Sequence, residues 1–185
     1  MKQVLRVFVL AAISTMASGG WVCAATVRAT NLHVHAGLDC VAKPGDAAKL
    51  AYNLAEGVRN SSTTASATVY CPVDIVRVMQ EDVSSSGPVA LRVFVIDRSS
   101  AGNITCTPKA IIENNGFDPG QSYPTKSSSG SFGSPQTLLW TGAELPAISN
   151  YTYRVSCTLP KAPDSSHQSA VVQTEVEVRS SLVVQ

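Results

Sequence analysis

Apolar and polar residues alternate along several segments of the chain. Between Tyr151 and Leu159 the odd positions hold Tyr, Tyr, Val, Cys and Leu, whereas the even positions hold Thr, Arg, Ser and Thr. Successive side chains of a β-strand point to opposite faces of the sheet, so this order predicts a strand with one buried and one polar face. The segment 170–179 has the same period, and its predicted buried face consists of Ala170, Val172, Thr174, Val176 and Val178. Its other face is mostly polar and consists of Gln173, Glu175, Glu177 and Arg179.

Shorter segments predict further strands. Residues 91–96 are largely apolar on both faces, which is typical of a central strand. Five shorter strands are predicted at residues 30–34, 67–73, 104–107, 109–113 and 137–140. No segment has a sustained helical period with caps, although residues 47–56 are compatible with one or two helical turns. The pattern therefore predicts about eight strands and an all-β fold.

The connections between these strands have the composition of turns. Gly, Pro, Ser, Asn and Asp concentrate in residues 42–46, 84–88, 114–120, 127–135 and 161–166. Such residues favour turns and end hydrogen-bonded ladders. Many short strands with turn-rich connections, and no alternation with helices, predict a two-sheet antiparallel β-sandwich of immunoglobulin-like or jelly-roll type.

The N-terminal region has the layout of a secretory signal peptide. Lys2 and Arg6 precede an apolar run from Val7 to Ile13, and small residues lead up to Ala25. The run is shorter than the about 20 residues of a membrane span, and no later stretch approaches that length. We expect cleavage after Ala25, so that residues 1–25 are removed from a bacterial protein that is secreted or periplasmic.

The cleavage site decides the length of the mature chain. Residues 26–185 are enough for a single domain with one core. The alternative start is a lipoprotein with a lipid on Cys23, although Trp21 and Val22 are bulky where that processing expects small residues.

The mature chain keeps four cysteines, which are Cys40, Cys71, Cys106 and Cys157. An even number in an exported chain predicts disulfides, because the compartments outside the cytoplasm are oxidising. Three connectivities are possible, and we favour Cys40 with Cys71 and Cys106 with Cys157. Each bridge would stabilise the domain by about 3–4 kcal/mol in the chain-entropy model. Cys71, Cys106 and Cys157 fall on the apolar side of their strands, where they can staple the core.

Candidate metal ligands are few. Zinc sites use ligand pairs about two to four residues apart, whereas the closest two of these four cysteines are 31 apart. His33 and His35 would share one face of a strand and could together hold a metal, but such a pair is more often solvated surface. Asn114, Asn115 and Asp118 offer oxygens to calcium without the spacing of an EF-hand. We predict no metal and no cofactor.

Charge and motifs argue against two large classes of function. The full chain has 14 basic and 13 acidic residues, and loss of Lys2 and Arg6 leaves 12 basic residues. This balance gives no electrostatic reason to expect nucleic acid or an acidic membrane as a partner. No Gly-x-Ser-x-Gly elbow accompanies the many serines, and Asp97 at a strand end is expected to be solvated or to cap a turn. We therefore predict no catalytic residue and no enzymatic activity.

Three aromatic residues in predicted loops are the candidate ligand contacts. Phe117, Tyr123 and Phe132 could stack on sugar rings, or they could cap the core. The sequence thus leaves three roles open: a binding or structural module of the cell surface or matrix, a carbohydrate-binding module, and an inhibitor of a hydrolase. The inhibitor would present the loops 114–123 and 127–135. The expected partner is a carbohydrate or a protein at the cell surface.

A resemblance agrees with this interpretation. The pattern is similar to that of a group of uncharacterised secreted bacterial β-sandwich proteins with two disulfides, which implies no specific activity. The motifs that carry the resemblance are Cys40, Asn60, Tyr70-Cys71-Pro72-Val73, Ile104-Thr105-Cys106 and the run from Tyr153 to Pro160. Pilus subunits are also small, exported and sandwich-like, but the chain ends in Val183-Val184-Gln185 without their alternating, aromatic-ended strand.

The predicted cleavage site and the predicted disulfides together determine the mass of the exported protein. We expect the exported protein to begin at Thr26 and to take up alkyl groups on four cysteines only after reduction. Intact-mass measurement with and without reduction, followed by peptide mapping, checks both statements. A lipid on Cys23 or free thiols in the native protein would contradict them.

Overall fold

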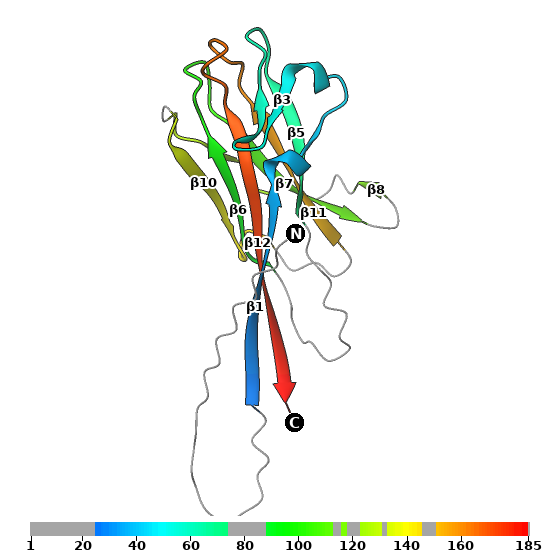
Figure 1. The fold of residues 1–185 in the computed structure, drawn as a ribbon. Coiled ribbons are helices and arrows are strands. Elements are labelled where there is room, and N and C mark those ends of the chain that lie inside the picture. The colour runs from blue at the N-terminus through cyan, green and yellow to red at the C-terminus, as the bar shows by residue number, and fades with distance from the viewer. Residues whose placement is uncertain are drawn as a thin grey trace, which may run out of the picture.

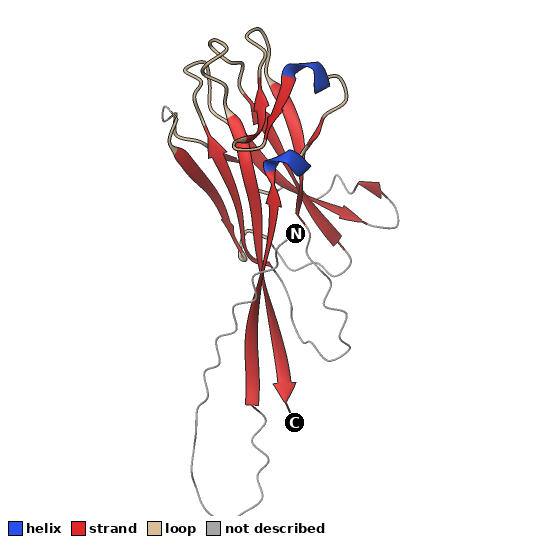
Figure 2. Cartoon of the chain, viewed as in Figure 1, coloured by secondary structure: helices blue, strands red, loops and turns tan. Residues whose placement is uncertain are grey.

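The computed structural model describes residues 25–73, 88–112, 116–117, 123–130, 133–145 and 151–184. Within these ranges the chain is built of strands and two short 3-10 turns, as Figure 2 shows. The strands are β1 (Ala25–Ala36), β2 (Val41–Ala42), β3 (Leu50–Asn53), β4 (Gly57–Asn60), β5 (Ala67–Val73), β6 (Pro88–Ile96), β7 (Thr105–Ile112), β8 (Gly116–Phe117), β9 (Lys126–Ser127), β10 (Pro135–Thr141), β11 (Tyr151–Leu159) and β12 (Ala170–Val184). The turns are η1 (Gly37–Asp39) and η2 (Ala47–Lys49).

The strands form two antiparallel sheets (Figure 1). The first sheet has the order β10-β6-β12-β4-β3, and β1 pairs with the remaining length of β12. The second sheet has the order β2-β5-β11-β7-β8, and β9 also pairs with β7. Residues of both sheets form one buried cluster, which includes Val93, Val95 and Trp140 from the first and Val69 and Val155 from the second. The predicted two-sheet β-sandwich is confirmed.

Strong alternation located two of the strands well. The predicted strands 67–73 and 151–159 have the bounds of β5 and β11. The two strands predicted at 104–107 and 109–113 are instead one strand, β7, which continues through Pro108. Proline lacks an amide hydrogen, and here it needs none, since β9 pairs with β7 at Thr105 and Cys106 while β8 pairs at Ile111 and Ile112. Pro108 lies in the gap between these two short partners.

The region predicted to contain helical turns forms a hairpin instead. Residues 47–49 make a single 3-10 turn, and β3 and β4 then pair from Leu50 with Asn60 to Asn53 with Gly57. This segment shows little alternation in the sequence. Its conformation is fixed by the strands with which it pairs and not by a period of its own. The short strands β2, β8 and β9 escape prediction for the same reason.

A β-bulge in β12 corrects the predicted face of that strand. Val172 was assigned to the buried face, but Val171 is fully buried while Val172 is only half-buried. The pairing with β6 shifts between Val171 and Gln173, which inserts one extra residue and reverses the alternation. At Thr174 and Val176 the predicted face is correct, since both residues are buried.

Two glycines pack tightly against this bulge. A Cβ atom on Gly37 would lie 2.0 Å from the carbonyl oxygen of Val171, and one on Gly57 would lie 2.2 Å from the same oxygen. Gly57 also has a φ of +78°, a conformation that favours glycine. Only residues without a side chain fit at these two positions.

The predicted disulfide connectivity is confirmed: one bridge joins two strands of the second sheet, and the other joins β5 to the residue just before β2. Cys106 and Cys157 are directly opposite each other on β7 and β11, and Cys40 bonds to Cys71 of β5. All four cysteines are buried. Disulfides indicate that the chain folds in an oxidising compartment. In the described part of the chain, no helix is long and apolar enough to cross a membrane.

Strands β1 and β12 continue beyond the sandwich as a two-stranded ribbon, which projects downward in Figure 1. The pairing of β12 with β6 ends at Val178, whereas its pairing with β1 extends to Ala25 and Val184. We call residues 25–31 and 178–184 the arm. The predicted strand 30–34 is thus only the middle of β1. Of the predicted signal peptide, residues 1–24 lie outside the described part of the chain.

Alanine substitutions at three glycines should separate steric overlap from backbone strain. Gly45 has a φ of +89° and nothing within 4 Å of an added Cβ, so Gly45→Ala should cost only about 1–2 kcal/mol of unfolding free energy. Gly37→Ala and Gly57→Ala meet backbone atoms and should cost about 3 kcal/mol or more. Urea unfolding of the three variants measures the difference. Equal effects at all three positions would contradict the tight packing around Val171.

Candidate functional site

Of the three predicted ligand-contact aromatics, only the side chain of Tyr123 is described. Tyr123 is only 5% exposed and belongs to the core cluster, as the alternative interpretation of a core-capping residue expects. Phe117 lies in β8, where only the backbone is described, and Phe132 lies outside the described residues. Ligand contact by Phe117 and Phe132 therefore stays a prediction.

The candidate metal ligands are only partly described. His33 and His35 of β1 lie opposite Val176 and Thr174, which places both histidines on the core side of the first sheet. His35 Nδ1 is 3.6 Å from Asp39 Oδ2. Among the described residues, no group of three or more His, Cys, Asp or Glu side chains is arranged to hold a metal ion. Asn114, Asn115 and Asp118, the calcium candidates, lie outside these residues.

The most regular polar surface is the outer face of the second sheet. Along β5, residues 105–109 of β7 and residues 154–159 of β11, every second residue is buried, and the residues between them point outward. Eight hydroxyl-bearing residues occupy this surface, which we call the hydroxyl face: Thr68, Tyr70, Thr105, Thr107, Thr125, Ser127, Ser156 and Thr158. None of the eight carries a charge at neutral pH.

The strand register arranges these residues in two rows. In one row Thr158 lies between Thr68 and Thr105, and Ser127 follows beyond Thr105. In the other row Ser156 lies between Tyr70 and Thr107. Strand geometry spaces such positions by about 4.8 Å across the strands and about 6.7 Å along them.

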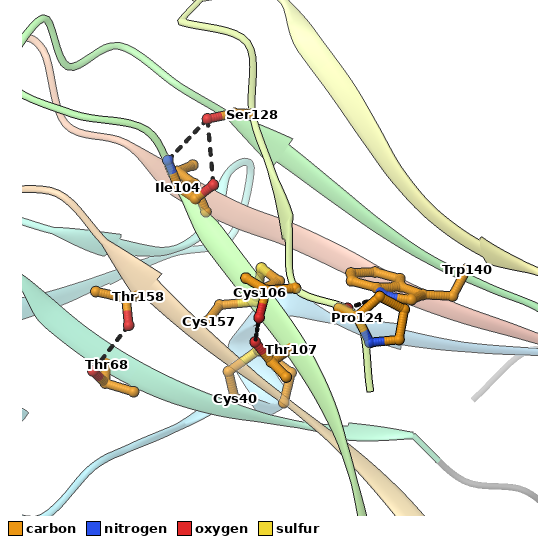
Figure 3. Close-up of a disulfide and its surroundings, with 12 residues drawn as sticks. Cys40, Thr68, Ile104, Cys106, Thr107, Pro124, Ser128, Trp140, Cys157 and Thr158 are labelled. Carbon is orange, nitrogen blue, oxygen red and sulfur yellow. Dashed lines mark hydrogen bonds between the residues drawn. A yellow bond between two sulfur atoms is a disulfide. The ribbon is translucent and has the colours of Figure 1, made fainter. Parts of the chain in front are cut away.

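Hydrogen bonds join neighbouring hydroxyls of this face, and Figure 3 shows the one between Thr68 and Thr158. Thr68 Oγ1 and Thr158 Oγ1 are 3.4 Å apart, and Thr107 Oγ1 and Thr125 Oγ1 are 2.7 Å apart. A hydroxyl can donate one hydrogen bond and accept two, so each pair keeps capacity for an additional partner. The face can therefore exchange several hydrogen bonds with a flat, polar surface.

The disulfides lie directly beneath the hydroxyl face. Cys106 separates Thr105 from Thr107, and Cys157 separates Ser156 from Thr158. Figure 3 shows the Cys106–Cys157 bridge close to Thr107 and Thr158. Because the bridge joins the two strands that carry the centre of both rows, it fixes their relative position.

Charged side chains gather at one end of the face. Arg154 of β11 lies over the ring of Tyr70, with its guanidinium carbon 4.5 Å from the ring centroid. Lys109 of β7 is directly opposite Arg154. Arg154 and Lys109 therefore border the row of Tyr70, Ser156 and Thr107, and the guanidinium group of Arg154 stacks on the Tyr70 ring.

Acidic groups near the face are paired with lysines. Lys126 Nζ lies 2.7 Å from Glu144 Oε1, and Lys49 Nζ lies 2.6 Å from Asp46 Oδ1. The hydrogen bond from Lys126 lowers the pKa of Glu144, and that from Lys49 lowers the pKa of Asp46. Both carboxylates are therefore ionised and matched by a cation at neutral pH, which leaves the hydroxyl face itself uncharged.

A second polar group is buried at one end of the sandwich. Asp97 is only 1% exposed, and its carboxylate accepts hydrogen bonds from Ser99 N at 3.0 Å, Ser169 Oγ at 2.9 Å, Ile104 N at 3.3 Å and Ser128 Oγ. The expectation that Asp97 is solvated is wrong, whereas its predicted turn-capping role is confirmed by the bonds to Ser99 N and Ile104 N. The sequence pattern did not show that loops from four strands converge on it.

This buried group serves to connect the sheets rather than to react. Asp97 and Ser169 lie at the ends of β6 and β12 in the first sheet, whereas Ile104 and Ser128 adjoin β7 and β9 in the second. Each carboxylate oxygen already has two donors. The neighbouring Arg98 donates to Glu56, with Nη2 2.7 Å from Oε1, and this lowers the pKa of Glu56.

Asn60 makes a similar connection at the same end. Its Nδ2 donates to the carbonyl oxygens of Ala65 at 3.0 Å and Pro160 at 2.9 Å, so that the end of β4 is tied to the end of β11. Its Oδ1 accepts from Ser62 N at 2.9 Å. Asn60 is fully buried, and these bonds satisfy both ends of its amide.

Sequence reasoning missed the hydroxyl face, although a signal was present. Three segments read hydroxyl-x-hydroxyl on the polar side of a strand: Thr68 with Tyr70, Thr105 with Thr107, and Ser156 with Thr158. Only the strand order, however, brings these three pairs side by side. Comparison with protein-family models and with curated protein sequences finds no match for this chain.

Removal of the Asp97 carboxylate should destabilise the fold. Asp97→Ala leaves the Ser99 amide and two hydroxyls without their buried acceptor, although the Ile104 amide keeps Ser128 Oγ at 2.8 Å, and should cost about 3 kcal/mol of unfolding free energy. Asp164→Ala is the control, because Asp164 is exposed and also accepts hydrogen bonds from a turn, and its stability should stay close to wild type. Urea unfolding monitored by Trp140 fluorescence compares them. A tolerated Asp97→Ala would show that packing alone joins the sheets.

Proposed function

We propose that the protein is an exported, non-enzymatic binding module whose hydroxyl face attaches to a neutral polysaccharide of the cell surface or extracellular matrix. The observation that carries the proposal is the double row of eight uncharged hydroxyl-bearing residues across four adjacent strands. The two disulfides support an oxidising compartment, and the signal-like N-terminus favours secretion or the periplasm.

The chemistry of the face suits a hydroxyl-rich polymer. Sugar hydroxyls donate and accept hydrogen bonds, as the side chains of Thr and Ser do. Binding between two such surfaces does not bury an unpaired charge. A single neutral hydrogen bond contributes only about 0.5–1.5 kcal/mol, so useful affinity requires several at once. Two rows of hydroxyls on one sheet supply such a set.

Rigidity increases the affinity that these weak contacts can give. A surface that is ordered before binding loses little conformational freedom when the ligand arrives. The Cys106–Cys157 bridge holds β7 and β11 together beneath the rows, and Cys40–Cys71 holds β5 to the segment before β2. At the border, the Tyr70 ring beside Arg154 offers an aromatic surface of the kind on which sugars stack.

Fewer observations support the other predicted functions. An inhibitor would act through the loops 114–123 and 127–135, and most residues of the first loop lie outside the described part of the chain. A purely structural module of the cell surface would have no need for an ordered array of hydroxyls. That role is the expected conclusion if the binding test below is negative.

The test removes hydroxyls while keeping the shape of the face. The protein and the variant T105V/T107V/T158V are incubated with insoluble cellulose and chitin, and the bound fraction is measured. We expect the wild type to bind at least one of these polymers, and the variant to bind about tenfold or more weakly. Valine has nearly the volume of threonine and favours strands, so the fold should persist.

Matched variants interpret the result. T137V/T141V removes two exposed hydroxyls from β10 in the first sheet and should bind as the wild type does. T105S/T107S/T158S keeps the hydroxyls and should retain most of the affinity. Failure to bind any of the polymers, or equal binding by the wild type and T105V/T107V/T158V, would contradict the proposed function.

A further inference from the structure

The outer edge of β1 is the longest strand edge that has no strand partner among the described residues. β1 has twelve residues, and within the described ranges its only strand partner is β12. The edge facing away from β12 therefore presents backbone N–H and C=O groups that no described strand uses. Such an edge is a template for pairing with another strand.

The remaining edges of the described sheets are short or blocked. β2, β8 and β9 have two residues each, and β3 has four. β10 begins at Pro135, which has no amide hydrogen, and Glu144 Oε2 accepts the amide of Thr141 at its other end, at 2.8 Å. These features hinder edge-to-edge pairing in the ways that proteins commonly use.

The sequence of β1 contains none of these protections. It reads ATVRATNLHVHA, without proline, lysine or any acidic residue, and Arg28 is its only formally charged side chain when the histidines are neutral. Half of the strand also lies in the arm, where residues 25–31 have β12 as their only described partner. A two-stranded ribbon is marginally stable in water, and a third strand adds a ladder of hydrogen bonds to it.

We propose that β1 pairs with β1 of a second copy of this chain and forms a symmetric dimer. Antiparallel pairing of the two identical edges satisfies a two-fold axis and gives the continuous strand order β12-β1-β1-β12. In this arrangement each copy uses the same residues and leaves neither β1 edge open. No residue of the hydroxyl face lies on β1, so both hydroxyl faces stay available.

The dimer does not depend on the proposed polysaccharide, but it would strengthen such attachment. Two hydroxyl faces in one particle would bind a repeating polymer with an effective concentration that a monomer lacks. The dimer test below contains no polysaccharide, so failure of either proposal can be distinguished from failure of the other.

The first measurement is the mass of the exported, oxidised protein in solution. Sedimentation velocity over about a hundredfold range of protein concentration should show a monomer that converts to a dimer. Hydrogen exchange of peptides from β1 should slow as the dimer forms, while exchange in β10 should not depend on concentration. A monomer at every concentration would overturn the proposal. So would slow exchange of both β1 edges in the monomer, because another segment of the same chain would then cover the outer edge.

Charge-matched variants locate the contact. A29K/N31K places two lysines on β1 and should raise the dimer dissociation constant by about tenfold or more. T137K/L139K places two lysines on the exposed edge strand β10 and should leave it unchanged. Hydrogen exchange in β11 confirms that both variants keep the core. A dimer weakened only by T137K/L139K would overturn pairing through β1.

Discussion

The two sheets depend on a buried carboxylate at one end of the sandwich. The Cys106–Cys157 bridge lies inside the second sheet, and Cys40–Cys71 ties β5 to the residue between η1 and β2, so the disulfides link no strand of the first sheet to a strand of the second. Asp97 accepts hydrogen bonds from groups at the ends of strands in both sheets. Burial makes each of these bonds stronger than it would be in water, and it also makes an unsatisfied group there costly. The positions of three loops, between β6 and β7, β9 and β10, and β11 and β12, consequently depend on this one side chain.

A second constraint acts where β12 changes partners. β12 pairs with β4 at Ala170 and Val171 and with β1 from Gln173 onward. The bulge at Val172 provides this change, and it brings the Val171 carbonyl against Gly37 and Gly57. Without these glycines β1 and β4 could not approach the same edge of β12. The extension of β1 into the arm thus depends on the packing at the bulge.

The hydroxyl face and the open edge of β1 lie in different sheets of the molecule. The hydroxyl face lies over the disulfide of the second sheet, where order favours the simultaneous formation of many weak hydrogen bonds. The arm belongs to the first sheet and consists of backbone with open hydrogen-bonding capacity. Attachment to a polymer and association between copies would therefore use different parts of the fold and need not compete.

Periodicity and composition in the sequence were enough to predict the β-sandwich, β5, β11 and the presence of disulfides, whereas three pairings of the cysteines remained possible. Alternation is a property of a single strand, and an exported chain with four cysteines favours disulfides whatever its partner strands are. The hairpin of β3 and β4, the bulge at Val172 and the burial of Asp97 were decided by tertiary structure, because each depends on groups distant in sequence. The same holds for the hydroxyl face, since Thr68, Thr105 and Thr158 lie on three strands that become neighbours only when the sheet forms.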